Sequence, residues 1–265
     1  MKRTLSNLNE ENTNHSCCND STELKEFTEA LTLHIGQHAF NPEFTYSLID
    51  ESKRTAETFS LRFDPFSLFL TSQNIPIELE DHVQRSSSES NALPDLNNVI
   101  DSYTVNGSKF NVHLHSFDSP EFISLHRRME IFAHFFIEGA SNIDPDEKWR
   151  ILVIYGPDGF VGYMTMYNFL KFPDKIRTRI SQFLILPPYR RQGHGTRLYQ
   201  AAYQYLMSVE KCEEITVEDG NPDFMRLRTK CDLVQVREAI PKKAEYKLKL
   251  TKAQLSKCLK LLNKQ

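Results

Sequence analysis

Residues 181–200, SQFLILPPYRRQGHGTRLYQ, are the stretch from which the fold of this chain can be read. Phe183 to Leu186 form a short apolar run typical of a buried strand. The two prolines that follow end this strand, because proline has no N–H for a sheet ladder. Gly193 and Gly195 then allow backbone conformations that other residues resist. Since apolar residues recur at helical spacing after them, the stretch predicts a strand, a tight basic turn and a helix.

The turn also predicts an anion site. A glycine turn that opens a helix leaves several amide N–H groups unpaired, at the positive end of the helix dipole. Arg190 and Arg191 add positive charge. The spacing Arg190-x-x-Gly193-x-Gly195 resembles the Arg/Gln-x-x-Gly-x-Gly/Ala signature of the acetyl-CoA-dependent N-acetyltransferases (the GNAT superfamily), whereas neither the P-loop nor the Rossmann pattern is present. A glycine-rich turn with a purely structural role stays open as the alternative.

Composition limits the class of protein. A chain of 265 residues with 40% hydrophobic and 25% charged residues is typical of a soluble globular protein of one large or two small domains. A net charge of −3 argues against a general nucleic-acid binder. Five cysteines without metal-like spacing indicate a reducing compartment and no metal site. Because neither a membrane-length apolar run nor a signal-peptide core is present, we expect an intracellular protein that binds no membrane.

The chain divides into four predicted parts. Residues 1–22 are polar and form a disordered tail. Residues 23–105 form a first domain with its own core, in which Phe59–Phe63 alternates as a strand. Residues 106–235 form the acetyltransferase domain. Residues 236–265 form an amphipathic helical segment that carries leucines at helical spacing.

The second domain has the element pattern of an α/β fold. A strand over residues 110–114 precedes a helix that starts at Ser119-Pro120, a capping serine and a proline at the first helical position. A hairpin follows over residues 150–155 and 160–167, then the strand–turn–helix already described, then a strand over residues 214–217 and a short helix over residues 222–230. The predicted fold is a mixed sheet flanked by helices, with a smaller α+β domain at the N-terminus.

Four blocks identify a family. Residues 161–168, 172–175, 181–195 and 215–219 together resemble the type B histone acetyltransferases, the histone acetyltransferase 1 family of the GNAT superfamily. The resemblance covers about residues 117–232. It implies a lysine N-acetyltransferase that acts on the N-terminal tail of newly synthesised histone four, together with a WD-repeat histone chaperone, in nucleus and cytoplasm. One departure is Gly220, which stands where the family usually has proline, and we expect it to loosen that turn.

The same resemblance implies the residues of the site. Acetyl-CoA, as co-substrate, is expected at Phe183, Leu184, Ile185, Arg190, Arg191, Gln192, Gly193, His194, Gly195, Thr196, Asn221 and Lys230. Glu218 matches the general base, with Glu138 and Asp219 as accessory acids. The histone tail is expected at Asp50, Glu51, Trp149, Tyr167, Asn168 and Phe169.

The chemistry explains why a carboxylate is needed. A free lysine has a pKa near 10.4, so only about one in a thousand is neutral at pH 7.4. A positioned carboxylate that removes the proton contributes roughly 10²–10⁴ in rate. Because no motif cysteine is placed for a covalent relay, we expect direct attack within a ternary complex. A backbone N–H near Ile185 would polarise the thioester oxygen.

Other interpretations stay open at this point. Glu218 and Asp219 could cap the next helix, Glu138 could be a solvated acid, and Trp149 could be a core residue. His194 fits a packing or hydrogen-bonding residue of the turn better than a catalyst. The chain could instead acetylate a small amine, against which the separate first domain argues. It could also be an inactive acetyl-CoA-binding module, against which the glycines and the candidate base argue.

Overall fold

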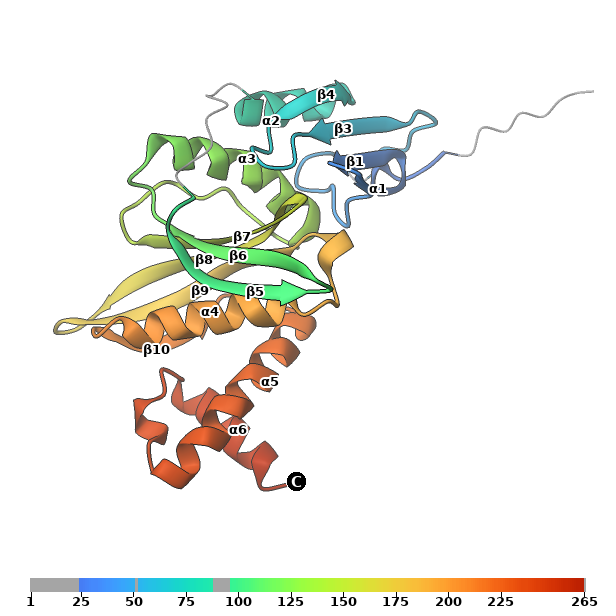
Figure 1. The fold of residues 1–265 in the computed structure, drawn as a ribbon. Coiled ribbons are helices and arrows are strands. Elements are labelled where there is room, and N and C mark those ends of the chain that lie inside the picture. The colour runs from blue at the N-terminus through green and yellow to red at the C-terminus, as the bar shows by residue number, and fades with distance from the viewer. Residues whose placement is uncertain (1–23, 51, 88–95, 265) are drawn as a thin grey trace, which may run out of the picture.

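The computed structural model describes residues 24–50, 52–87 and 96–264 (Figure 1). The predicted tail, residues 1–22, and the predicted substrate residue Glu51 lie outside this range. Within it, two hydrogen-bonded sheets are stacked, with helices above, between and below them (Figure 1).

The first sheet is small and belongs to the N-terminal region. Its strands are β1 (Leu31–Ile35), β2 (His38–Phe40), β3 (Phe59–Phe63) and β4 (Leu70–Asn74), in the order β2-β1-β3-β4. Strands β1 and β3 run parallel and the other pairs are antiparallel. Helices α1 (Phe27–Ala30) and α2 (Ile77–Ser87) complete this part. Strand β3 buries its alternate phenylalanines and leucine, which confirms the predicted strand and the α+β character of the region.

The second sheet has six strands in the order β10-β9-β8-β7-β6-β5. These are β5 (Val99–Val105), β6 (Ser108–His115), β7 (Trp149–Gly156), β8 (Gly159–Lys171), β9 (Lys175–Ile185) and β10 (Cys212–Val217). All pairs are antiparallel except β9 with β10, so the predicted mixed sheet is confirmed. Strand β7 is buried on both faces: Ile151 and Val153 pack on one side, Leu152 and Ile154 on the other.

Helices cover both faces of this sheet. Helix α3 (Pro120–Phe136) covers one face and begins where the Oγ of Ser119 accepts the Phe122 N–H at 3.3 Å. Helices α4 (His194–Ser208) and α5 (Pro222–Ala239) lie on the other face, followed by α6 (Lys252–Leu262) (Figure 1). Short 3₁₀ turns occur at η1 (Pro187–Tyr189), η2 (Ile240–Lys242) and η3 (Glu245–Lys247). No helix in the described ranges is long and apolar enough to cross a membrane.

Helix α5 is longer than predicted. The sequence predicts a helix that ends near Lys230, but the structure continues it to Ala239. The extension is stabilised by tertiary burial, because Cys231, Val236 and Ala239 are all buried. Packing of an apolar face is what usually stabilises a helix in a protein, and it outweighs a weak local signal.

Two predicted domain boundaries cut through elements of this structure. Strand β5 pairs with β6, so a boundary at 105/106 separates a strand from its own sheet. A boundary at 235/236 falls inside α5. The first region was also expected to have its own core. Instead, its buried residues form one continuous cluster with α3 and one face of the large sheet, so the α3 layer joins the two parts.

Candidate active site

A gap opens in the large sheet where β10 leaves β9. The two strands pair in parallel up to Val217 opposite Ile180, and the Glu218 N–H donates to the Ile180 carbonyl at 2.9 Å. Strand β10 then ends, while β9 continues to Ile185. A bulge at Ser181–Gln182 lies at the same level, opposite Thr165 of β8. Among the described strands, none pairs with the far edge of residues 181–185.

The backbone of β9 presents its polar groups to this gap. The Leu186 N–H donates to Val161 of β8 at 2.9 Å. Successive N–H groups of a strand point to opposite sides, so the Ile185 N–H points away from β8 and into the gap. The Ile185 carbonyl on that side accepts a hydrogen bond from Arg190 Nε at 2.8 Å. An extended ligand can therefore pair with the free edge of β9, as a peptide adds to a sheet.

The basic turn lies beside this edge. Helix α4 begins after Gly193, whose φ of +96° is favourable for glycine and costly for other residues. The first helical hydrogen bond runs from the Arg197 N–H to the Gly193 carbonyl. The amides of residues 194–196 therefore lack partners within the helix and lie at its positive end. The predicted anion site thus has the expected backbone geometry.

Ten of the twelve predicted cofactor residues line one groove of about 880 Å³: Phe183, Leu184, Ile185, Arg190, Arg191, Gly193, Gly195, Thr196, Asn221 and Lys230. The other two do not line it. Gln192 donates to the Pro188 carbonyl at 2.7 Å, and His194 is buried. Six further residues that the sequence did not predict line the same groove: Glu43, Phe136, Asp223, Phe224, Arg226 and Leu227.

His194 anchors the turn to the sheet. Its Nδ1 and the Tyr103 hydroxyl are joined by a hydrogen bond of 2.7 Å, and its ring packs on Phe110. Burial lowers the pKa of His194 and so favours the neutral form of the ring. This geometry agrees with the interpretation of His194 as a packing and hydrogen-bonding residue.

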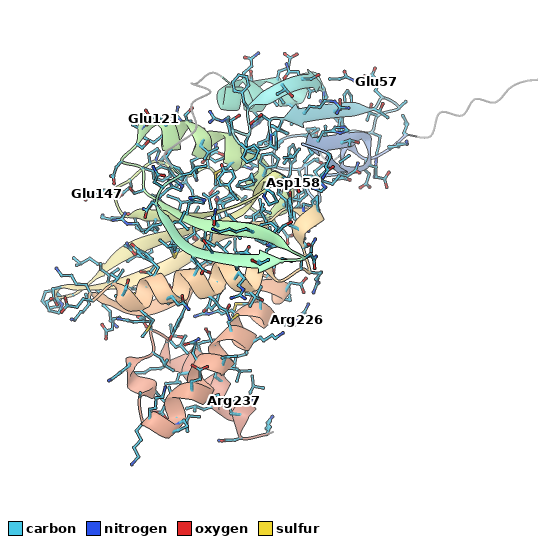
Figure 2. The ribbon with its side chains drawn as sticks, in the orientation of Figure 1. Glu57, Glu121, Glu147, Asp158, Arg226 and Arg237 are labelled. Carbon is cyan, nitrogen blue, oxygen red and sulfur yellow. The ribbon has the colours of Figure 1, made fainter. Side chains whose placement is uncertain are left out.

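The arginines of the groove differ in what they contact. Arg190 forms an ion pair with Glu43 and lies over the Phe136 ring at 5.5 Å, so it joins the N-terminal region to the turn. Arg191 lies 3.1 Å from Asp223, with 86% of its side chain exposed. Arg226, labelled in Figure 2, pairs with the same aspartate. The position of Arg226, one helical turn before Lys230, is the sequence signal by which it could have been found.

A second pocket, of about 660 Å³, opens on the other side of Glu218. Its wall includes the three predicted catalytic acids, Glu218, Glu138 and Asp219, together with Trp149 and Tyr167. Asp144 and Asp146 add two carboxylates, and Arg179 adds one positive charge. Among the described residues that line it, the acids therefore outnumber the bases by five to one. Such a pocket attracts cations.

Two side chains orient the carboxylate of Glu218. The Ser181 hydroxyl donates a short hydrogen bond to Oε2, and Arg179 Nη2 lies 3.2 Å from Oε1. The cap of the next helix is instead Asn221, whose Oδ1 accepts the Phe224 N–H at 2.8 Å. The interpretation of Glu218 and Asp219 as helix caps is therefore wrong. The side chain of Asn221, expected at the cofactor, is engaged in this cap.

Aromatic rings form one wall of the pocket. Trp149 and Tyr167 line it and meet edge to face with ring centres 4.8 Å apart. Phe169, with its ring centre 4.7 Å from that of Tyr167, packs beside them but does not itself line the pocket. Asn168 does not belong to this wall, because side chains of a strand alternate between faces. Its Oδ1 accepts a hydrogen bond from Thr178 at 2.7 Å on the opposite face.

The segment 137–146 closes the pocket and is held at several points. Gln182 donates to the Ser141 carbonyl at 3.1 Å and accepts a hydrogen bond from the Tyr163 hydroxyl at 2.9 Å. The Gly139 N–H donates to the Tyr46 hydroxyl at 2.7 Å. Glu138, just beyond the end of α3, is exposed on this segment.

Two further residues with expected roles, Asp50 and Gly220, lie outside this pocket. Asp50 does not line this pocket; its carboxylate accepts the Ser52 N–H and hydroxyl, and these hydrogen bonds lower its pKa. A Cβ at Gly220 would lie 3.0 Å from Val217 and 2.9 Å from Met225, so a larger residue would require these side chains to shift. That Gly220 loosens the turn stays a prediction.

The sequence matches two family models and several known proteins. The sequence model of the "Acetyltransferase (GNAT) family" matches residues 112–231, and that of the "Histone acetyl transferase HAT1 N-terminus" matches residues 64–138. Three similar proteins each carry the name "Histone acetyltransferase type B catalytic subunit". The protein from Kluyveromyces lactis is 32% identical over 260 residues, covering 78% of this chain and 66% of that protein.

The other two relatives are matched over shorter parts. The protein from Cryptococcus neoformans is 39% identical over 146 residues, covering 51% of this chain and 35% of its own length. The protein from Mus musculus is 36% identical over 163 residues, covering 56% of this chain and 39% of its own length. The chain thus matches between about a third and two thirds of each of these relatives.

Proposed function

Because this chain belongs to the family of histone acetyltransferase type B catalytic subunits, we propose that it is an acetyl-CoA-dependent lysine N-acetyltransferase that acts on a histone tail. One observation carries the proposal. Strand β9 passes from one pocket to the other: its residues 181–182 line the acid-lined pocket together with Glu218, and its residues 183–185 line the cofactor groove. A donor bound along β9 and a lysine in the acid pocket would meet at Glu218.

The residues of the groove fit acetyl-CoA, which supplies the acetyl group as a thioester. The free edge of β9 suits the extended pantetheine arm, and the amides of residues 194–196 suit the pyrophosphate. Arg191, Arg226 and Lys230 add positive charge. The Ile185 N–H, which points into the gap, is the donor placed to polarise a carbonyl oxygen there.

Glu218 is the general base of the proposed reaction. Its carboxylate removes a proton from the lysine ammonium, and the neutral amine then attacks directly within a ternary complex. Glu138 and Asp219 lie in the same pocket, and their negative charges hold the positively charged substrate near the base. The three cysteines in the described ranges are buried, and none lines either pocket, which favours direct transfer over a thiol relay.

The substrate that fits best is the basic tail of histone four. Such a tail has many positive charges and little apolar surface, so acids and aromatic rings are what can recognise it. The pocket supplies five carboxylates and the rings of Trp149 and Tyr167. A WD-repeat histone chaperone as partner, and a location in nucleus and cytoplasm, are part of the same proposal and rest on the family.

An acetyl-transfer assay tests this function. The chain is incubated with labelled acetyl-CoA and either the histone four tail peptide or spermidine, and the products are identified by mass spectrometry. We expect acetylated lysine in the peptide with kcat/KM at least about a hundredfold above that for spermidine. Equal values for the two acceptors would favour a small-amine enzyme. Binding of acetyl-CoA without any transfer would favour an inactive module.

A further inference from the structure

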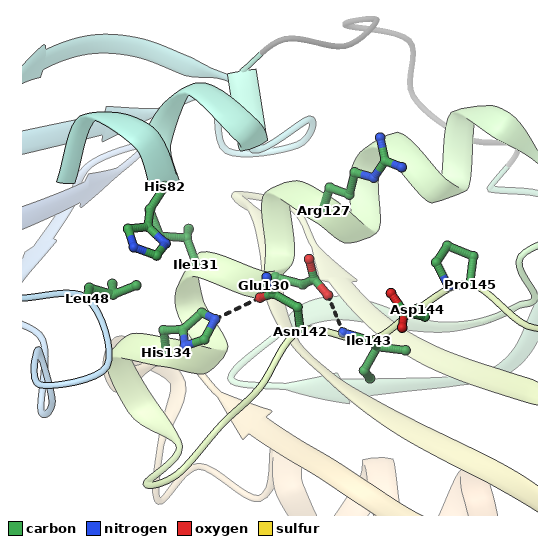
Figure 3. Close-up of a pocket in the computed structure, with 10 residues that line it drawn as sticks. All are labelled: Leu48, His82, Arg127, Glu130, Ile131, His134, Asn142, Ile143, Asp144 and Pro145. Carbon is green, nitrogen blue, oxygen red and sulfur yellow. Dashed lines mark hydrogen bonds between the residues drawn. The ribbon is translucent and has the colours of Figure 1, made fainter. Parts of the chain in front are cut away.

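Figure 3 shows a third pocket, of about 320 Å³. It lies next to the acid-lined pocket of Glu218, which is called the catalytic pocket below. Helix α3 supplies one wall, and His82 of α2 and Leu48 close another side. The remaining wall is the segment Asn142–Pro145 (Figure 3). The same four residues also line the catalytic pocket, so the two pockets are separated by a single segment of chain.

Glu130 of α3 is the charged group at the centre of this pocket. Its Oε1 accepts the Ile143 N–H at 2.7 Å, while the other carboxylate oxygen points into the pocket (Figure 3). The side chain is only 13% exposed. Burial raises the pKa of Glu130 to about 7, with the nearby carboxylate of Asp144 as a smaller cause in the same direction.

The charges around Glu130 do not neutralise it. Among the described residues, His126 comes within ion-pair distance, at 3.8 Å from Oε1. Burial lowers the pKa of His126 to about 3, so this ring is neutral at physiological pH. Arg127, three residues before Glu130 on α3, lowers the pKa of Glu130 by its positive charge, but its guanidinium points away from the carboxylate (Figure 3). Burial makes the ionised form of Glu130 costly, so the group takes up a proton near pH 7; a bound cation would stabilise the ionised form instead.

We propose that this pocket binds a second basic side chain of the same tail substrate, a lysine or arginine near the acetylated lysine, with Glu130 as its carboxylate partner. The inference rests on the proposed function. Leu48, Ile131 and Pro145 offer apolar contacts for the methylene stem of a long basic side chain. The shared wall of segment 142–145 lets one extended chain enter both pockets. Enzyme specificity would then depend on a basic neighbour of the target lysine.

A double-mutant cycle between protein and peptide tests this proposal. Glu130→Gln keeps an oxygen that can accept the Ile143 N–H and removes the charge. Each basic residue of the tail peptide other than the target is replaced in turn, lysine by glutamine and arginine by citrulline. We expect Glu130→Gln to raise the peptide KM, and the peptide Kd by calorimetry, about tenfold or more with kcat unchanged. One peptide replacement should raise KM for the wild type and have no further effect on the variant.

Glu121→Gln is the matched control. Glu121 lies at the first turn of the same helix, is exposed, and accepts a hydrogen bond from Ser119 (Figure 2). The same change of charge there should leave the peptide KM as it is.

Three outcomes would overturn the proposal. They are an unchanged KM and Kd for Glu130→Gln, additive effects for every peptide replacement, or a fall in kcat at constant KM, which would make Glu130 a positioning residue for segment 142–145. In each of these cases the wild type still acetylates the tail, so the proposed function would stand. Failure of the proposed function would appear instead as a wild type that neither binds nor acetylates the peptide.

Discussion

Arg179 Nη2 lies 3.2 Å from Oε1 of Glu218, so the proposed general base is paired with a guanidinium of its own chain. The guanidinium carbon of Arg179 also lies 4.8 Å from the centre of the Phe169 ring. A carboxylate and an aromatic face are also the kinds of group that attract a substrate ammonium. On the proposed function, we expect Arg179 and the substrate lysine to compete for Glu218.

Arg179→Gln tests this competition. Without the guanidinium, the pocket is more negative and the carboxylate is free for the ammonium, so we expect the KM for the tail peptide to fall by about threefold or more. The measurement is steady-state kinetics at saturating acetyl-CoA. A rise in KM together with a fall in kcat would contradict the competition and show that Arg179 orients the base.

Glu218→Gln tests the base itself. The amide keeps the shape and still accepts the Ser181 hydroxyl, but it cannot take up the proton of lysine. We expect kcat to fall by at least about a hundredfold, because a general base contributes about 10²–10⁴. Calorimetry should find the affinity for acetyl-CoA unchanged. A variant with the kcat and pH–rate profile of the wild type would rule out Glu218 as the base.

The variants Gly193→Ala and Gly107→Ala together distinguish the effect of backbone strain on stability from an effect on acetyl-CoA binding. Both glycines have positive φ, +96° and +81°, and a Cβ at either meets nothing within 4 Å. Each change should cost about 1–3 kcal/mol of unfolding free energy through backbone strain. Only Gly193 lines the cofactor groove, so only its variant should weaken acetyl-CoA binding, by about tenfold or more. Equal affinities in calorimetry would remove the assignment of the turn as the anion site.

The predicted role of Asp50 can be tested against a neighbouring acid. If Asp50 faces the basic tail, Asp50→Asn should raise the peptide KM by about twofold to threefold at 0.1 M salt. The effect should vanish toward 1 M salt, where the Debye length falls from about 10 Å to about 3 Å. Glu57→Gln is the control, since Glu57 is an exposed acid of the same region (Figure 2). Equal effects of the two changes would show only a general loss of negative charge.

Glu130 should also make stability depend on pH. Because burial raises its pKa from an ordinary value of 4.5 to about 7, the folded state binds a proton more tightly than the unfolded state. The wild type should therefore lose stability as pH rises from about 4.5 to about 7, relative to Glu130→Gln. Thermal unfolding of both proteins across this range measures the difference.

The exposed Glu121 should affect the pH dependence of stability in the opposite direction to Glu130. The Ser119 hydroxyl lowers the pKa of Glu121, so its contribution to stability is present above the ordinary carboxyl pKa and is lost as pH falls. Both the wild type and Glu121→Gln keep Glu130, so the wild type should show no loss of stability relative to Glu121→Gln as pH rises from 4.5 to 7. A loss relative to Glu121→Gln as large as the loss relative to Glu130→Gln would show that the effect has no relation to the burial of Glu130.

Local sequence was sufficient to predict where an element begins or ends when contacts between neighbouring residues decide its conformation. The prolines after Leu186 end β9, the positive φ of Gly193 opens α4, and Ser119 caps α3. Steric exclusion and capping act over a few residues, so these signals are readable in the chain itself. The length of α5 could not be predicted from local sequence, because its second half depends on the burial of Val236 in the folded protein.

Only the tertiary structure decided which of these residues meet. Arg190 and Glu43 are 147 residues apart, yet they pair, so a residue that lines the predicted cofactor groove also links two regions of the chain. Arg179 reaches Glu218 because β9 and β10 run side by side, and Glu130 becomes a buried acid because segment 142–145 folds over α3. Long-range packing sets such distances and desolvation, and no local pattern of residue types encodes them.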